Sequence, residues 1–140
     1  MKNKIMIVPC SGIGKAYGEI GRQAVYEAVD NRPDKADTAC LGRLMIEDPD
    51  LKDSLPNKFI ITVDGCAKDC AKKIVESIGG QADSSFRVIE VFKDHRDLKP
   101  AGVLELGDAG FQLAHILADR VISEIDRLLK EEKDADRDRT

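Results

Sequence analysis

The sequence predicts an α/β protein with a three-layer, open, mostly parallel sheet and helices on both faces. Short apolar runs alternate with helical patterns along the chain, as right-handed parallel βαβ units require. The run over 58–63 is continuous and β-branched, which is typical of a strand covered on both faces. The 140 residues suffice for one domain. We expect it over 4–132, followed by a charged, disordered tail over 133–140.

The first half of the chain contains two clear elements and one segment without a clear pattern. Residues 4–9 form an apolar run that is expected to be a buried strand entering a glycine-containing turn. Residues 15–31 carry apolar side chains at helical spacing, and Pro33 ends that helix. Residues 36–46 fit a strand end, a loop or a short helix. The charged segment over 47–56 is expected to contain a short helix.

The second half is expected to alternate strand and helix after the strand over 58–63. A helix is predicted over 66–78, where Gly79-Gly80 would stop it. Another apolar run predicts a strand over 86–92. A long helix is predicted over 108–132, with a core stripe made by Ala114, Leu117, Val121, Ile125 and Leu128.

The composition argues against nucleic-acid and membrane proteins. The net charge is −4, and the aromatic content is 4% without Trp, so neither phosphate contacts nor base stacking are favoured. There is no apolar run of about 18 residues, the length that a membrane span needs. The apolar run over 5–9 is too short for the core of a signal peptide. We therefore expect a cytoplasmic protein.

Four cysteines, Cys10, Cys40, Cys66 and Cys70, are the main candidates for chemistry. Any one of them alone is more often an inert core residue. However, Cys10 follows the first predicted strand directly, and Cys66 comes just after the strand that ends at Val63. Parallel strands end at one edge of a sheet, where ligands bind. Both cysteines would also lie near helix N-termini, which favour the thiolate.

The spacing of the last two cysteines suggests a shared ion. Cys66 and Cys70 are four residues apart, so on a helix they would share one face. Cys10 and Cys40 would complete the four sulfur ligands that zinc prefers in a tetrahedral site. An iron–sulfur cluster or a dithiol redox pair would use the same residues and remains an alternative.

Three segments carry a resemblance to a known family: Pro9-Cys10-Ser11-Gly12, Cys40-Leu41, and the run Ile61-Thr-Val-Asp64-Gly65-Cys66-Ala-Lys-Asp-Cys70. Together they resemble the DGC-domain family, which is named for its Asp-Gly-Cys motif. The resemblance covers roughly residues 5–92. Members are described as zinc-binding proteins of unknown function with four chelating cysteines. The resemblance thus implies metal ligation by all four cysteines of this chain, and it implies no reaction.

Several neighbouring residues have both a functional and an ordinary interpretation. Asp64 would be a helix cap or an acceptor near the metal, and Gly65 would let the backbone approach the ion, but Asp-Gly is also a common turn. The loop over 11–15 lacks the Ser or Thr that follows Lys in a phosphate loop. His95 is more often a solvated loop residue than a ligand, and His115 a packing residue.

Two functions follow from these features. The first is a metal-binding or partner-binding module with a closed four-cysteine zinc site, since catalytic zinc usually keeps three protein ligands and a water. The second is a thiol-based redox enzyme or iron–sulfur protein, which the location at the active-site edge of α/β enzymes favours. The metal ion is the expected ligand. A protein partner or a homo-oligomer remains open.

Overall fold

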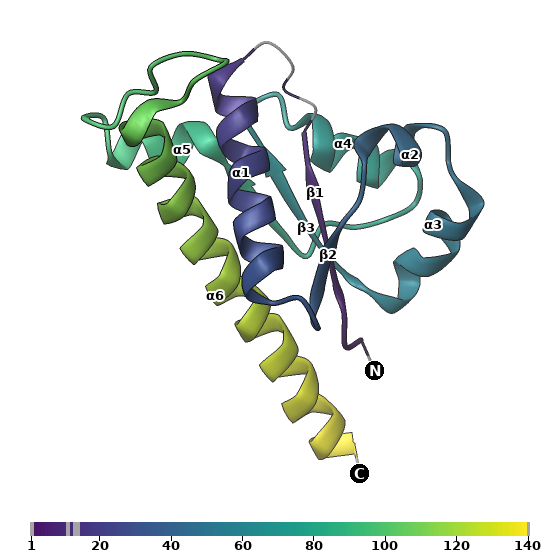
Figure 1. Ribbon diagram of the computed structural model, residues 1–140. Helices are drawn as coiled ribbons and strands as arrows, with labels where there is room; N and C mark the ends of the chain where they lie inside the picture. Colours follow the sequence, from purple (N-terminus) through teal and green to yellow (C-terminus); the bar gives the residue numbers. More distant parts are fainter. Residues whose placement is uncertain (1, 11, 13–14, 140) are drawn as a thin grey trace.

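The computed structural model describes residues 2–10, 12 and 15–139. Four short strands pair only in parallel, in the order β2-β1-β3-β4, and they lie at its centre (Figure 1). They are β1 (Ile5–Pro9), β2 (Ala36–Thr38), β3 (Phe59–Asp64) and β4 (Ser84–Arg87). The predicted α/β class with a parallel sheet is therefore confirmed.

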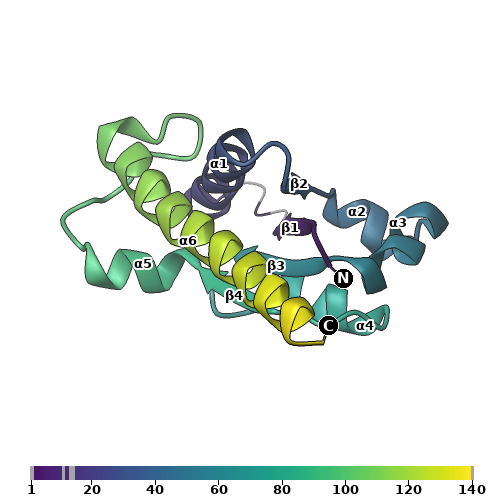
Figure 2. The ribbon, with the colours of Figure 1, turned by 90° about the horizontal axis from the view of Figure 1, so that it is seen from below.

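Helices cover both faces of this sheet (Figure 2). One face is covered by α1 (Ala16–Asn31), α5 (Val88–Asp94) and α6 (Gly107–Arg139). The other face is covered by α2 (Leu41–Met45), α3 (Pro49–Ser54), the 3₁₀ turn η1 (Leu55–Asn57) and α4 (Cys70–Ser77). The three predicted layers are thus present.

Strand β1 shows why the sheet needs both helical layers. Its side chains alternate between the two faces. Ile5 and Ile7 pack into the core beneath α1 and α6, while Met6 and Val8 pack into the core beneath α2 and α4. All four side chains are fully buried, so each face of β1 contributes to a separate apolar cluster.

The strand order places a crevice between β1 and β3. The chain passes from β1 outward to β2, and from β3 outward in the opposite direction to β4. The loops after β1 and β3 therefore diverge onto opposite faces, which is where open α/β sheets bind ligands. Pro9 and Val63 are partners in the parallel ladder, and the Cys10 N–H donates to the Val63 carbonyl at 2.9 Å. The first cysteine is thereby held against β3.

One predicted strand is wrong, and one unassigned segment forms two short elements. The expected strand over 86–92 is β4 only as far as Arg87, and Val88 begins α5. Val88 and Val91 are both buried at helical spacing, because a short apolar run serves a buried helix as well as a strand. The unassigned residues 36–46 contain β2 and α2.

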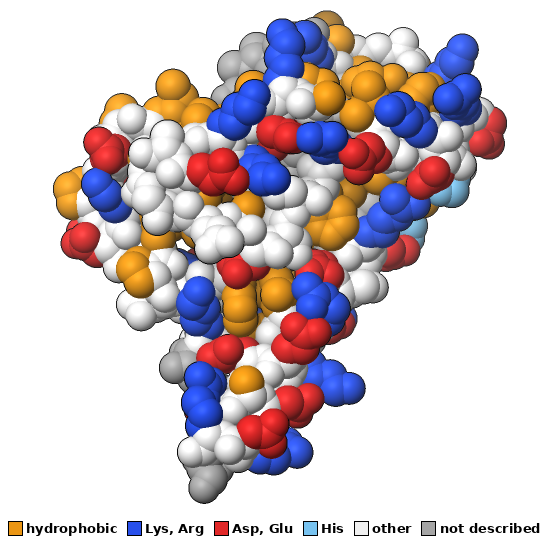
Figure 3. Space-filling model, turned by 180° about the vertical axis from the view of Figure 1, so that it is seen from behind, with side chains coloured by type: hydrophobic (Ala, Val, Ile, Leu, Met, Phe, Trp, Pro, Cys, Tyr) orange, Lys and Arg blue, Asp and Glu red, His pale blue; other side chains and the backbone are white. Residues whose placement is uncertain are grey.

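The last helix is longer than the sequence predicts. It was expected to end near Glu132 with a disordered tail over 133–140, but α6 continues to Arg139 and projects beyond the sheet (Figure 1). Acidic and basic side chains are interspersed on this projecting end (Figure 3). Pairs at helical spacing, such as Arg127 with Glu131, support it. In the part of the chain that the structure describes, every helix is too short or too polar to cross a bilayer.

Candidate metal centre

Three of the four cysteines follow three adjacent strands. Cys10 comes directly after β1, Cys40 two residues after β2, and Cys66 two residues after β3. These strands are parallel neighbours, so their carboxyl ends share one edge of the sheet. Cys70 begins α4 at the same edge. The edge predicted for Cys10 and Cys66 is found, and β2 brings Cys40 to it.

Cys10, Cys66 and Cys70 line one cavity of about 390 Å³, which we call the thiol cavity. Its other walls come from the start of α1, from α2 and from α4. The loop over 66–69 and α4 therefore face the loop after β1 across this space. The structure brings three thiols from two separate loops and a helix start to one hollow.

Cys40 lies beside this cavity and does not line it. Its side chain is exposed, and together with Cys10 it borders a second hollow of about 360 Å³. Leu41 lines both hollows and so stands between them. Over residues 2–10, 12 and 15–139, no three Cys, His, Asp or Glu side chains are grouped so as to hold a metal ion. Convergence of all four thiols stays a prediction.

The predicted pairing of Cys66 and Cys70 on one helix face is wrong. Helix α4 begins only at Cys70, and Cys66 lies in the turn before it. Asp69, between them, has a φ of 55°. This left-handed conformation does not occur inside a regular α-helix, so α4 cannot extend back through Asp69 to Cys66. The two thiols reach the same cavity because of this turn, and not because of helical spacing.

Asp64 holds the start of α4 from a distance. One carboxylate oxygen accepts from the Ala71 N–H at 2.8 Å and the other from the Lys72 N–H at 3.4 Å. These are the unpaired donors of the first helical turn. The predicted capping role is found, although Asp64 precedes the helix by six residues. Burial raises the pKa of this carboxyl, which is only 2% exposed, and the two hydrogen bonds oppose that rise.

Arg87 is a site residue that the sequence did not indicate. At the end of β4, its Nε donates to Asp69 Oδ1 at 2.8 Å and its Nη2 to Oδ2 at 2.5 Å. This bidentate pair lowers the pKa of Asp69 and raises that of Arg87. Because Asp69 lies between Cys66 and Cys70, the pair ties the thiol-bearing turn to the sheet. No local pattern marks a contact across 18 residues.

Three glycines bring the two loops together. A Cβ on Gly18 would lie 2.4 Å from the Cα of Gly12, and a Cβ on Gly65 would lie 3.2 Å from the Gly18 nitrogen. Gly12 after β1, Gly18 in the first turn of α1 and Gly65 after β3 thus pack backbone against backbone. An added side chain on Gly65 would meet α1, while Gly65 itself lines the thiol cavity, so the close approach of its backbone to an ion stays a prediction. Gly18 was not predicted as a site residue.

The electrostatic environment of Cys10 differs from the prediction. Burial raises the pKa of its thiol, the neighbouring Asp64, Cys70 and Cys66 add to that rise, and the Gly65 N–H opposes it by donating to Sγ at 3.3 Å. Helix α1 begins at Ala16, too far along the chain for the helix dipole to dominate. Burial and these neighbours therefore favour the neutral thiol.

The sequence profile of the DGC domain matches residues 6–107. The chain belongs to the DGC-domain family. The match includes all four cysteines and Arg87, and it extends beyond Phe92, where the resemblance in the sequence ended. Comparison with curated proteins and with solved structures gave no match.

Neither histidine of this DGC-domain chain faces the thiols. His95 caps the end of α5, and His115 on α6 contacts Glu27 of α1. Neither is among the described residues that line the thiol cavity. The loop interpreted as a weak phosphate-loop candidate, 11–15, falls largely outside the described residues.

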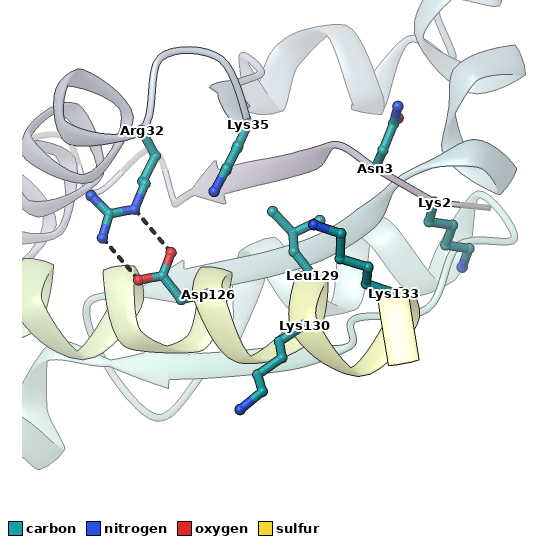
Figure 4. A pocket seen from close by; sticks show the side chains of 8 residues that line it. All are labelled: Lys2, Asn3, Arg32, Lys35, Asp126, Leu129, Lys130 and Lys133. Carbon is teal, nitrogen blue, oxygen red and sulfur yellow. Dashed lines mark hydrogen bonds and ion pairs between the residues drawn. The ribbon is translucent and has the colours of Figure 1, made fainter. Parts of the chain in front are cut away.

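A second groove, which we call the lysine groove, lies near the N-terminal ends of β1 and β2. It measures about 510 Å³, and Figure 4 shows Lys35 and Lys133 on either side of Leu129. At one end Arg32 is paired with Asp126 through two hydrogen bonds of 2.9 and 2.8 Å. No cysteine or histidine occurs among its described lining residues. The four cysteines instead lie at the carboxyl edge of the sheet.

Proposed function

We propose that this DGC-domain protein binds one zinc ion through Cys10, Cys40, Cys66 and Cys70, as a metal-binding or partner-binding module. The observation that carries this proposal is the thiol cavity, which three of these side chains line. Thiolates are soft ligands that suit zinc. Cys10 also borders the hollow that Cys40 faces, so it lies between the other ligands.

The position of Cys40 is compatible with this ligand set. Cys40 directly precedes α2, a helix of five residues, and only a short segment separates it from β2. The Cys40 side chain is exposed, so the thiol can change direction while Leu41 and Leu44 of α2 stay in the core. The other three cysteines need no such movement to face one space.

Bound zinc would add a cross-link between the loops after β1, β2 and β3. The residues of this chain orient the ligands for it. Asp64 holds the α4 start that carries Cys70, Arg87 holds the turn through Asp69, and the Gly65 N–H donates to the Cys10 sulfur. This arrangement supports a structural site more than a catalytic one.

One observation favours the alternative of a thiol-based redox or iron–sulfur protein. Cys40 and Cys70 are exposed, so an oxidant or a cluster could reach them. The raised pKa of Cys10 argues against this cysteine as a nucleophile. In either form of the proposal the protein acts in the cytoplasm, a reducing compartment in which free thiols persist.

Metal analysis of the freshly purified protein tests the proposal. We expect about one zinc per chain, and a cobalt-substituted sample with the intense sulfur-to-cobalt absorption of a thiolate site. Each Cys→Ser variant should lose most of the metal. The variants His95→Ala and His115→Ala are matched controls and should retain it.

Other outcomes of the same experiment would reassign the site. Brown protein with iron and sulfide would identify an iron–sulfur cluster. Metal-free protein that turns over a thiol oxidant would identify a redox enzyme. Full metal retention by Cys40→Ser would reduce the ligand set to the three cysteines of the thiol cavity.

A further inference from the structure

The thiol cavity has walls that metal binding does not explain. Besides the sulfur atoms, apolar side chains from three helices line it: Tyr17 from α1, Leu41 and Met45 from α2, and Ile74 from α4. Its volume of about 390 Å³ far exceeds that of one ion and lies in the range of small-molecule sites. The cavity therefore has room for an organic ligand above the thiols.

The Lys, Arg, Asp and Glu side chains that line the cavity have one sign. Lys15 and Lys68 line it, and no carboxylate occurs among its described lining residues. Two carboxylates lie nearby, but Asp64 accepts from the N–H groups of α4 and Asp69 is held by Arg87. Within the described part of the chain, neither lysine has an ion-pair partner. The rim therefore attracts an anion.

The apolar part of the rim is unusually exposed. Met45 lines the cavity and is 64% exposed, and the adjoining Ile46 is 77% exposed. Large apolar side chains at the mouth of a concave site gain free energy when a ligand covers them.

We propose that the thiol cavity binds a small organic anion with an apolar body. Lys15 and Lys68 contact the anionic group, and Leu41 and Met45 contact the body. This ligand site goes beyond zinc binding and does not require it, because the side chains assigned to the ligand are different from the four cysteines.

Three probes separate charge from apolar contact. Binding of octanoate, octan-1-ol and inorganic phosphate to the full chain is measured by titration calorimetry, with the protein as purified and after metal removal. We expect octanoate to bind more tightly than either other probe, and its affinity to fall as salt is added. Equal binding of octan-1-ol, or equal binding of phosphate, would overturn the proposal.

Two variants locate the site. The double variant Lys15→Gln/Lys68→Gln should bind octanoate about fivefold more weakly, the effect of losing two exposed ion pairs, with octan-1-ol unaffected. Met45→Ser should weaken both. The control Lys72→Gln/Lys73→Gln changes two α4 lysines that do not line the cavity, and an equal loss there would refute the assignment. The metal content of the same samples is measured as a separate test of the zinc proposal.

Discussion

The two ends of the sheet both carry a hollow bordered by lysines, but different forces shape them. At the carboxyl end, backbone contacts among Gly12, Gly18 and Gly65 define the thiol cavity. At the opposite end, long side chains and the Arg32–Asp126 ion pair border the lysine groove (Figure 4). A single added atom should therefore disturb the first hollow, whereas a single lost ion pair should barely affect the second.

The contact between α1 and α6 and the turn that carries the thiols also differ in what stabilises them. Helices α1 and α6 join through fully buried side chains such as Ala24, Val25, Leu117 and Val121, with ion pairs only at the margin. The thiol-bearing turn instead depends on two carboxylates, Asp64 and Asp69. Large apolar area stabilises the former, and specific hydrogen bonds the latter.

Metal removal is the largest expected effect and would sharpen this contrast. At a free zinc concentration about 1,000 times the dissociation constant, the ion should add about 4 kcal/mol to the free energy of unfolding. A strong chelator should lower the melting temperature by roughly 10 °C and increase proteolysis over 36–55. Strands β1, β3 and β4 and helix α6 should resist. Identical melting of both forms would contradict a structural role.

Gly18→Ala should disturb the carboxyl end next most strongly. The new Cβ would lie 2.4 Å from the Gly12 Cα, so the loop after β1 must move away from α1. We expect a loss of about 1–3 kcal/mol in urea denaturation and weaker zinc binding. Gly102→Ala is the matched control, since its nearest atom lies 3.7 Å away. Comparable losses in both variants would show that the close contact is unimportant.

Asp64→Ala should cost about 1–2 kcal/mol, because it removes the acceptor for the first N–H groups of α4. Cys70 should then lose its fixed position, and cobalt absorption should weaken. Arg32→Gln, at the opposite end, removes an exposed pair with Asp126 and should change the urea midpoint very little. If Arg32→Gln were the more destabilising variant, the contrast between the two ends would fail.

The smallest effect is expected from pH at the α1–α6 margin. His115 is hydrogen-bonded to Glu27 and lies 3.5 Å from Asp119, and these contacts raise its pKa above the ordinary 6.5. A pKa raised by folding stabilises the folded state fully below about pH 6.5, and this contribution disappears as the pH rises through the folded-state pKa. Wild type should exceed His115→Gln in urea midpoint at pH 5.5, and match it at pH 8.5.

Much of the fold followed from local patterns. The runs at 4–9 and 58–63 and the helical spacing over 15–31 correspond to β1, β3 and α1, since strand and helix periodicity are properties of neighbouring residues. The strand predicted over 86–92 is wrong beyond Arg87. The apolar residues of this segment fit a strand, but Val88 and Val91 lie in a helix and pack against the core. Charged residues 133–139 continued α6 because ion pairs at helical spacing support it.

By itself, the sequence determined that Cys10 and Cys66 lie at the carboxyl edge, because a parallel sheet gathers its strand ends on one side. Only the tertiary structure decided that Cys70 joins them in the thiol cavity while Cys40 faces a neighbouring hollow. The contacts responsible, such as Gly12 with Gly18 and Asp69 with Arg87, involve backbone approach or residues distant in the chain. Neither kind of contact has a periodic signature, so each becomes visible only when the chain is folded.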